Sequence, residues 1–171
     1  MFFFSVWKFA AQQFAKKRCL GTRKIFEEKK VDGPNGKKFT KLIMDSQYQW
    51  TNYEDIYHQS TYVGRWKLYK KFSEKMSIYL LFVKFNTTIY RGLQMLGMKS
   101  RDKLVMYCDT KAEWMITAVG CFKFNFTLVT IYTNLGAEGV IYGINQTEAN
   151  YICTSQELLP KLMKVLDKVF F

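Results

Sequence analysis

Between residues 105 and 169 the hydrophobic period alternates three times between that of a strand and that of a helix. Short apolar runs at 105–108, 126–132 and 150–153 have the length and the β-branched or aromatic content of strands. Each run leads into a segment whose apolar residues recur at the spacing of one helical face. Parallel strands need such crossovers, and these crossovers are right-handed. The sequence therefore predicts an α/β fold with a mainly parallel sheet built by three βα units.

The apolar positions of the expected helices mark the faces that pack on this sheet. Trp114 lies on that face of the first helix, so we interpret it as a core aromatic side chain rather than a substrate contact. The face of the second helix consists of Val140, Ile141 and Ile144. The face of the third is a longer stripe of Leu158, Leu159, Leu162, Met163, Leu166 and Val169.

Local signals also predict where helices begin and end. The capping-box pattern S/T-x-x-E occurs at Thr51 with Glu54, Thr110 with Glu113 and Thr154 with Glu157. In this motif the hydroxyl accepts a hydrogen bond from a free N–H of the first helical turn. We therefore expect helices to begin directly after these three threonines. Asn125 and Gly97 are residue types that tolerate the left-handed conformation in which many helices end.

Polar residues follow the strands at the edge where open α/β sheets bind ligands, outside the carboxyl ends of the strands. These residues are Asp109 with Thr110, Tyr132 with Thr133, and Thr154 with Ser155. Tyr132 and Thr133 are the candidate cofactor-binding residues, although no Gly-rich phosphate loop adjoins them. Asp109 is interpreted as a solvated residue and Glu113 as a helix cap. No residue is predicted to be catalytic.

The cysteines give no metal site. Cys19, Cys108, Cys121 and Cys153 are widely separated, without a C-x-x-C pair, and His58 is the single histidine. We interpret His58 as a surface residue, and this pattern argues against zinc. Three of the cysteines lie in expected strand or helix cores, where a reduced cysteine behaves as a small hydrophobe. This placement indicates a reducing compartment.

Net charge separates the two parts of the chain. Residues 1–104 contain 21 Lys and Arg against 8 Asp and Glu, whereas residues 105–171 contain 5 against 6. The excess of +12 therefore does not belong to the βα units. Only five of the 26 basic residues are Arg, the residue favoured for bidentate base and phosphate recognition. Because no nucleic-acid-binding motif accompanies the charge, we expect no nucleic-acid partner.

The front of the chain has three recognisable parts. Residues 1–18 form a leader with Phe3, Trp7, Ala10 and Phe14 on one helical face, followed by Lys16, Lys17 and Arg18. This leader is either an amphipathic helix that lies on a membrane surface or an artefactual, unordered segment. Residues 31–51 are a β-rich lead-in with a turn at 32–36. Residues 65–90 fit no element; Lys, Phe, Tyr, Ile and Asn fill 14 of these 26 positions.

Five blocks of the sequence carry a resemblance to a known family. They read CLGTRKIFEE, YQWTNYEDIY, GLQMLG, CDTKAEWMITAVGCFKFNFTLVTIY and LGAEGVIYGINQTEANYICTSQELL. In this order they resemble eukaryotic long-chain acyl-CoA synthetases, which are adenylate-forming, AMP-binding enzymes. The resemblance covers residues 19–63 and 92–165. It implies that residues 19–171 are part of the large N-terminal domain, interrupted at 65–90 by a suspected insertion of translated intron or a genuine lineage-specific loop.

The resemblance also implies a reaction. The family activates a long-chain fatty acid with ATP and Mg²⁺ to an acyl-adenylate, which CoA captures as a thioester, at the cytosolic face of an intracellular membrane such as the endoplasmic reticulum. The family's phosphate loop, Tyr-Gly-x-Thr-Glu motif, ribose-binding Asp and C-terminal lysine have no counterpart here. We therefore expect a fragment that is inactive by itself and binds none of these cofactors. The alternative is a non-catalytic α/β module that docks on a membrane or a partner.

Overall fold

The computed structural model describes residues 2–33, 36, 38–60, 68–73, 76–82, 93 and 97–169. The elements of the first half are α1 (Phe2–Gln13), β1 (Arg18–Thr22), β2 (Ile25–Asp32), β3 (Lys38–Met44), β4 (Gln49–Asn52), α2 (Tyr53–Gln59), β5 (Leu68–Ser73) and β6 (Met76–Phe82). Those of the second half are β7 (Lys103–Tyr107), α4 (Ala112–Phe124), β8 (Thr127–Thr130), α5 (Ala137–Thr147), β9 (Tyr151–Thr154), α6 (Leu159–Met163) and the 3-10 turn η2 (Leu166–Lys168). A β-rich lead-in therefore precedes three βα units, as the sequence predicts.

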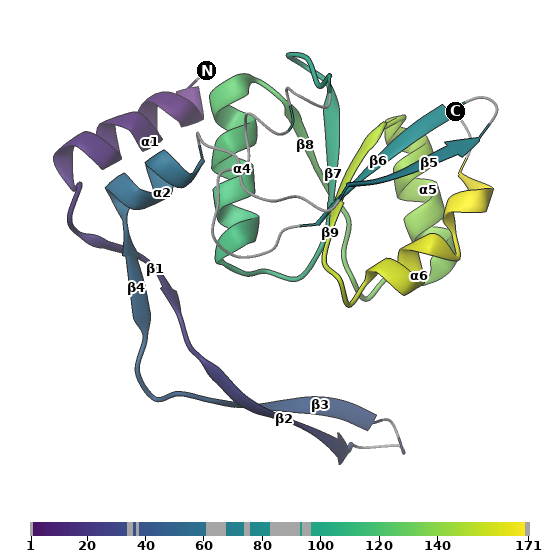
Figure 1. Cartoon of the computed structure of the whole chain (residues 1–171), viewed down its shortest axis with the longest axis horizontal. Helices are drawn as coiled ribbons and strands as arrows, with labels where there is room; N and C mark the ends of the chain where they lie inside the picture. Colours follow the sequence, from purple (N-terminus) through teal and green to yellow (C-terminus); the bar gives the residue numbers. More distant parts are fainter. Residues whose placement is uncertain are drawn as a thin grey trace.

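The βα units build a five-stranded sheet with the order β5-β6-β9-β7-β8 (Figure 1). Strands β6, β9, β7 and β8 run parallel, and β5 pairs with β6 antiparallel. On β7, Met106 lies opposite Cys153 of β9 and Thr130 of β8. The mainly parallel sheet predicted from the alternating periods is confirmed, and β9, the last strand in the sequence, occupies its centre.

Each face of the sheet carries its own hydrophobic cluster. The cluster under α5 and α6 contains Val105, Tyr107, Ile131, Val140, Ile141, Ile144, Ala149, Ile152, Leu162, Val165, Leu166 and Val169. The cluster under α4 contains Leu93, Met98, Leu104, Met106, Cys121, Phe126, Tyr151 and Cys153. Trp114 packs against this second cluster, so its interpretation as a core residue is confirmed. The alternation of β7 residues between the two clusters follows from the two-residue period of a strand.

Two helix ends lie where the sequence places them. Asn125 closes α4 at φ 57° and ψ 38°, and the N–H of Phe126 donates to the carbonyl oxygen of Cys121 at 2.9 Å. Gly97 has φ 88°, and the N–H of Met98 donates to the carbonyl oxygen of Leu93 at 3.0 Å. Both bonds span five residues, as in the Schellman motif, in which a left-handed residue turns the chain back onto the last helical turn.

The three predicted capping boxes are wrong. Helix α2 is capped by Asn52, whose side-chain oxygen accepts from the N–H of Asp55 at 2.8 Å. The N-cap residue of α4 is Lys111, which provides no side-chain hydrogen bond, so Thr110 lies one residue too early. Thr154 is the last residue of β9, and α6 begins only at Leu159. A hydroxyl caps a helix only from the N-cap position itself, so a shift of one residue removes the bond.

The third helix is also shorter than predicted. Its apolar stripe is divided between α6 and η2, and Leu162 and Leu166 are buried whereas Met163 is 36% exposed. Helix α2 ends at Gln59. The buried side chains still belong to one cluster, so the stripe correctly predicted the face that packs on the sheet.

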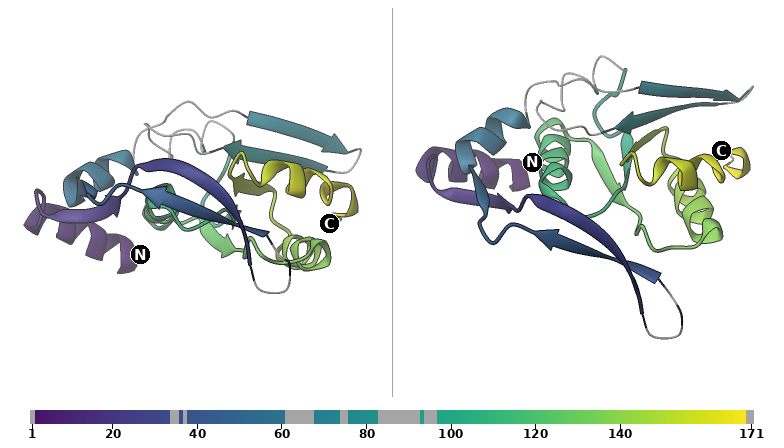
Figure 2. Two further views of the ribbon diagram at one scale, coloured as in Figure 1. Left: turned by 90° about the horizontal axis from the view of Figure 1, so that it is seen from below. Right: turned by 60° about the horizontal axis from the view of Figure 1, so that its bottom comes forward.

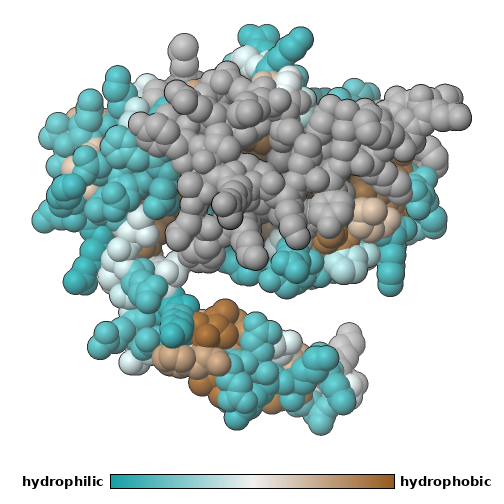
Figure 3. Space-filling model, viewed as in Figure 1, coloured by the Kyte–Doolittle hydropathy of each residue, from teal (hydrophilic) through white to brown (hydrophobic). Residues whose placement is uncertain are grey.

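The lead-in is one long antiparallel ribbon made of two nested strand pairs. Strand β1 pairs antiparallel with β4, and the β2–β3 hairpin lies between them in the chain and pairs antiparallel. The β2–β3 hairpin stands away from the sheet (Figures 1 and 2). It exposes large apolar side chains, seen as the brown patch in the lower part of Figure 3: Ile25, Phe26, Phe39, Leu42 and Ile43. Strands β3 and β4 match the predicted lead-in, whereas β1 and β2 were not predicted.

The leader forms helix α1, which packs on the domain. The ring centroid of Tyr53 on α2 lies 6.0 Å from that of Trp7 and 6.3 Å from that of Phe14. An ion pair joins Lys16 to Glu54. The face expected on a membrane surface therefore has a partner within the chain. Among the described helices, none is long and apolar enough to cross a membrane.

The range 65–90 contains β5 and β6. Residues 79–82 of β6 lie beside residues 151–154 of β9, so the described part of this range extends the sheet at one edge. Its origin as an insertion stays a prediction, as do the boundaries at 1–18 and 19–171.

Candidate functional site

The carboxyl ends of β7, β8 and β9 meet at one edge of the sheet, where the sequence placed its candidate residues. The hydroxyl of Thr133 donates a hydrogen bond to the Oδ1 atom of Asp109 at 2.7 Å. This bond joins the segment after β8 to the segment after β7. Asp109 is exposed, Thr133 is half-buried and Tyr132 is 78% exposed. The structure thus brings Thr133 and Asp109 together and directs Tyr132 outward.

Lys161 of α6 crosses to the same edge. Its ammonium nitrogen donates to the carbonyl oxygen of Thr133 at 2.7 Å and to that of Leu135 at 2.8 Å. The same nitrogen lies 5.8 Å from the ring centroid of Tyr107, within the range of a cation–π interaction. Lys161 therefore fixes the turn at residues 132–135 with two charge-assisted hydrogen bonds.

Two buried hydroxyl groups lie below this edge. Tyr107 and Thr154 lie opposite each other in neighbouring strands, and both side chains are fully buried. Within the described part of the chain, neither hydroxyl oxygen has a hydrogen-bond partner. An unpaired buried hydroxyl is destabilising, because it has lost its water without a replacement. Because both side chains are fully buried in the sheet, we treat them as core positions.

A short acidic turn follows β9. The pKa of the Glu157 carboxyl is lowered, chiefly by the nearby Ser155 side chain, with smaller contributions from the backbone N–H of Glu157 and the positive charge of Lys111. Glu157 is exposed, so water screens this charge. The turn therefore carries a stable carboxylate at neutral pH, which repels phosphate groups rather than binding them.

Two thiols meet on the α4 side of the sheet. Cys108, directly after β7, packs against the same hydrophobic cluster that contains Cys153 of β9. The interaction between the two thiols lowers the pKa of Cys108 and raises that of Cys153, which burial raises further. Burial alone raises the pKa of Cys121 to about 12. The pair was not predicted, because Cys108 and Cys153 are far apart in the sequence.

The helix starts at this edge do not form a phosphate cradle. The N-cap of α4 is Lys111 and that of α5 is Gly136, both in extended conformation without a side-chain cap. Phosphate sites at helix starts combine the free N–H groups with a Gly-rich loop that lets the backbone surround the anion. Only the turn before α5 contains a glycine, and Lys161 is engaged with its carbonyl oxygens. The described residues at this edge therefore provide no such cradle for a phosphate group.

The other candidates have simple structural roles. Glu113 lies in the first turn of α4, and its carbonyl oxygen accepts from the Thr117 hydroxyl at 2.7 Å. His58 is exposed on α2 beside the ring of Tyr57, so its interpretation as a surface residue is confirmed. In the described parts of the chain, no group of three or more His, Cys, Asp or Glu residues is placed to hold a metal ion.

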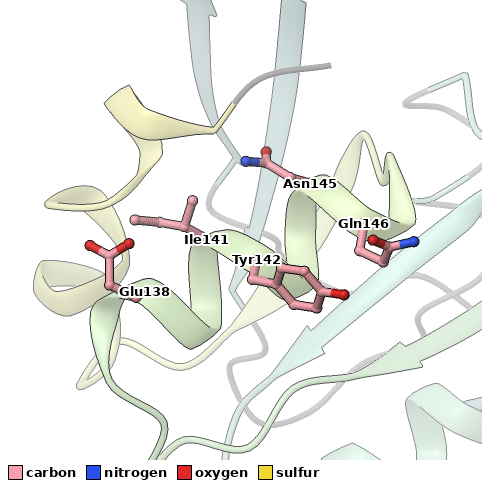
Figure 4. Close-up of a pocket in the computed structure, with 5 residues that line it drawn as sticks. All are labelled: Glu138, Ile141, Tyr142, Asn145 and Gln146. Atoms are coloured by element: carbon pink, nitrogen blue, oxygen red, sulfur yellow. The ribbon is translucent and has the colours of Figure 1, made fainter.

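A shallow depression on α5 is a further concave surface. It is lined by Glu138, Ile141, Tyr142, Asn145 and Gln146. All five belong to a single helix, and Figure 4 shows their side chains spread along it rather than converging on one point. Tyr142 is 67% exposed. A depression without converging polar groups lacks the geometry of a small-molecule site.

The sequence signals found the edge but missed its organising residue. Lys161 stands 28 residues after Thr133, in a helix that the pattern marked only by its apolar stripe. The one local sign of this contact in the sequence is the position of the lysine between two leucines of the apolar stripe, from which its side chain can extend beyond the helix toward the sheet.

Comparisons with known proteins place this fold. Residues 89–170 match a family model described as AMP-binding enzyme. The chain is 29% identical over 150 residues to long chain acyl-CoA synthetase 8 of Arabidopsis thaliana, covering 87% of this chain and 17% of that protein. It is 26% identical over 180 residues to long-chain-fatty-acid–CoA ligase 1 of Schizosaccharomyces pombe, covering 97% and 22%. The chain thus spans about a fifth of the length of the curated relatives it matches.

Solved structures show the same fold at low sequence identity. The adenylation domain of a carboxylate reductase from Mycobacterium chelonae has a TM-score of 0.64 at 11% identity, covering 97% of this chain and 21% of that one. A long-chain-fatty-acid-CoA ligase from Archaeoglobus fulgidus has a TM-score of 0.61 at 12% identity, covering 97% and 25%. The predicted fold class and the predicted resemblance are confirmed.

Proposed function

Because residues 89–170 match a family model described as AMP-binding enzyme, we propose that this chain is part of an ATP-dependent ligase that converts long-chain fatty acids to acyl-CoA through an acyl-adenylate. The observation that carries the proposal is that relatives matching 87% to 97% of the chain are long-chain fatty acid ligases. Fatty acid, ATP and CoA are accordingly the proposed substrates, with Mg²⁺ bound to ATP.

The residues described here support the reaction rather than perform it. Thr133 is hydrogen-bonded to Asp109 through its hydroxyl and to Lys161 through its carbonyl oxygen, which fixes the turn after β8. We therefore assign no catalytic residue to this chain, and we propose that by itself it neither adenylates fatty acids nor binds ATP.

We further propose an intracellular location at the cytosolic face of a membrane. Lys17 and Arg18 are exposed between α1 and the start of β1, and Val6 and Phe9 on α1 expose 50% and 58% of their surface. A basic cluster next to exposed apolar side chains is typical of helices at anionic lipid surfaces. Trp7 contacts Tyr53 of α2. Helix α1 therefore binds the membrane either through the face that points away from α2 or after it has separated from α2.

Two assays test the ligase proposal. The chain alone, supplied with ATP, Mg²⁺, palmitate and CoA, is expected to release no pyrophosphate and to give no saturable ATP binding in calorimetry. In the second assay, the matching stretch of the full-length Schizosaccharomyces pombe ligase is replaced by residues 89–170 of this chain. We expect this chimaera to form palmitoyl-CoA.

The control is a chimaera with the same stretch in scrambled order, which should be inactive. A folded chimaera that forms no acyl-CoA would contradict the family function of this segment. Palmitate-dependent pyrophosphate release by the chain alone would contradict its supporting role.

A further inference from the structure

Cys108 and Cys153 lie on the same face of neighbouring parallel strands. Cys153 is opposite Met106 in the register of β7 and β9, and Cys108 follows Met106 by two residues. Residues two apart on a strand point to the same side. Cys153 is a member of the hydrophobic cluster under α4, and Cys108 packs against that cluster. The two thiols are therefore neighbours on this face of the sheet.

The two thiols differ in accessibility and charge. Cys153 is completely buried, whereas Cys108 is half-buried at the end of its strand. Asp109 and Glu113 face Cys108 with negative charge and Lys111 faces it with positive charge. The interaction with Cys153 lowers the pKa of Cys108, whereas the interaction with Cys108, together with burial, raises the pKa of Cys153. This asymmetry resembles that of an attacking and a resolving thiol.

We propose that Cys108 and Cys153 form a peroxide-sensitive thiol pair that closes to an intramolecular disulfide at the carboxyl edge of the sheet. The Cys108 thiolate attacks one oxygen of a hydroperoxide, and the O–O bond breaks. The leaving alkoxide or hydroxide takes a proton, which leaves Cys108 as a sulfenic acid. Cys153 then attacks the sulfenyl sulfur; its proton joins the departing hydroxyl group as water, and the S–S bond forms.

The disulfide would change the edge described above. A disulfide holds two Cα atoms about 5.5–6 Å apart, so its formation draws the segment after β7 toward β9. Asp109 is the next residue, and it accepts the hydrogen bond of Thr133. Oxidation therefore acts on the bond that joins the segments after β7 and β8. This inference concerns two thiols of this chain and does not rest on the proposed ligase function.

Peptide mapping tests the pair directly, because trypsin separates all four cysteines. Cys19 falls in residues 19–23, Cys108 in 104–111, Cys121 in 112–123 and Cys153 in 124–161. The full reduced chain is treated with a small excess of hydrogen peroxide, blocked with N-ethylmaleimide under denaturing conditions and digested. We expect the loss of two of the four free thiols and a linked peptide of 104–111 with 124–161, both reversed by a dithiol reductant.

Two variants complete the test. In Cys153→Ala the sulfenic acid of Cys108 cannot be resolved, so labelling of residues 104–111 by dimedone should increase several-fold over wild type. Cys19→Ser is the matched control and should leave the linked peptide unchanged. Retention of all four thiols, linkage of Cys108 to Cys19 or to a second chain, or over-oxidation of Cys108 in the wild type would each overturn the proposal. The peptide map of the wild-type chain decides the pairing by itself, so the test remains decisive even when a variant fails to fold.

Discussion

Replacing Lys161 by methionine tests whether the sheet edge depends on this one side chain. Methionine keeps the length and apolar stem of lysine but removes the ammonium group, and with it the hydrogen bonds at 2.7 Å and 2.8 Å to the carbonyl oxygens of Thr133 and Leu135. A hydrogen bond to a charged group contributes about 1.5–3 kcal/mol when buried. Because Lys161 is half-buried and water can replace it at both oxygens, we assign about 1 kcal/mol to each bond.

The expected loss is therefore about 2 kcal/mol in the free energy of unfolding, which for a chain of this size corresponds to about 4–8 °C in melting temperature. Urea unfolding followed by circular dichroism measures the first quantity, and thermal melting measures the second. The matched control is Lys164→Met, which removes the same charge from the exposed C-cap residue of the same helix. This control should change the free energy of unfolding by less than about 0.5 kcal/mol.

A second variant asks whether the two contacts act on one turn. Thr133→Val removes the hydroxyl that donates to Asp109, with an expected loss of about 1 kcal/mol. Since Lys161 holds the backbone of the same residue, the double variant should differ from the sum of the single variants by at least about 0.5 kcal/mol. Equal stability of Lys161→Met and Lys164→Met, or strict additivity with Thr133→Val, would refute the reasoning.

Three further predictions concern single positions. Asn52→Ala removes the cap of α2 and should lose about 1 kcal/mol of stability in urea unfolding, whereas Thr51→Ala should lose clearly less. A larger loss for Thr51→Ala than for Asn52→Ala would instead support a capping box that starts at Thr51. Asn125→Ala should be about 1 kcal/mol less stable than Asn125→Gly. Both variants lose the asparagine side chain, but only alanine is strained in the left-handed conformation at φ 57°. Equal stabilities would argue against a left-handed helix end at this residue. The lowered pKa of Glu157 stabilises the folded state above the ordinary value of 4.5, and this stabilisation is lost as pH falls through the lowered pKa. Ser155→Ala should therefore raise the pKa of Glu157 in a carboxyl NMR titration and weaken the dependence of stability on acid pH. An unchanged titration would exclude Ser155 as the cause.

The local features of this fold could be predicted from contiguous residues. The stripe of Val140, Ile141 and Ile144 identified the buried face of α5, because the period of a helix fixes which side chains share a face. Asn125 and Gly97 marked helix ends, because the left-handed conformation excludes most other residue types. The number and order of the βα units followed from the alternation of the two periods.

Prediction from the local sequence failed at the helix starts, where a shift of one residue decides which side chain is the N-cap. The S/T-x-x-E pattern is the same whether the chain enters the helix at the threonine or one residue later, and at α4 the helix begins at Ala112. Which residue becomes the N-cap depends on how far the preceding strand continues in the sheet. At α2 the last residue of β4, Asn52, takes the cap position because the strand runs one residue past Thr51.

The contacts that organise the candidate site were decided by the tertiary structure alone. Whether Cys108 meets Cys153 depends on β9 lying between β6 and β7, and the residues between the two cysteines carry no sign of that strand order. The reach of Lys161 to Thr133 likewise depends on where α6 crosses the sheet. The sequence determined the elements and their buried faces, because these depend on neighbours within one or two turns. Strand order and crossover geometry determined which side chains meet, because distant segments become neighbours only when the whole sheet has formed.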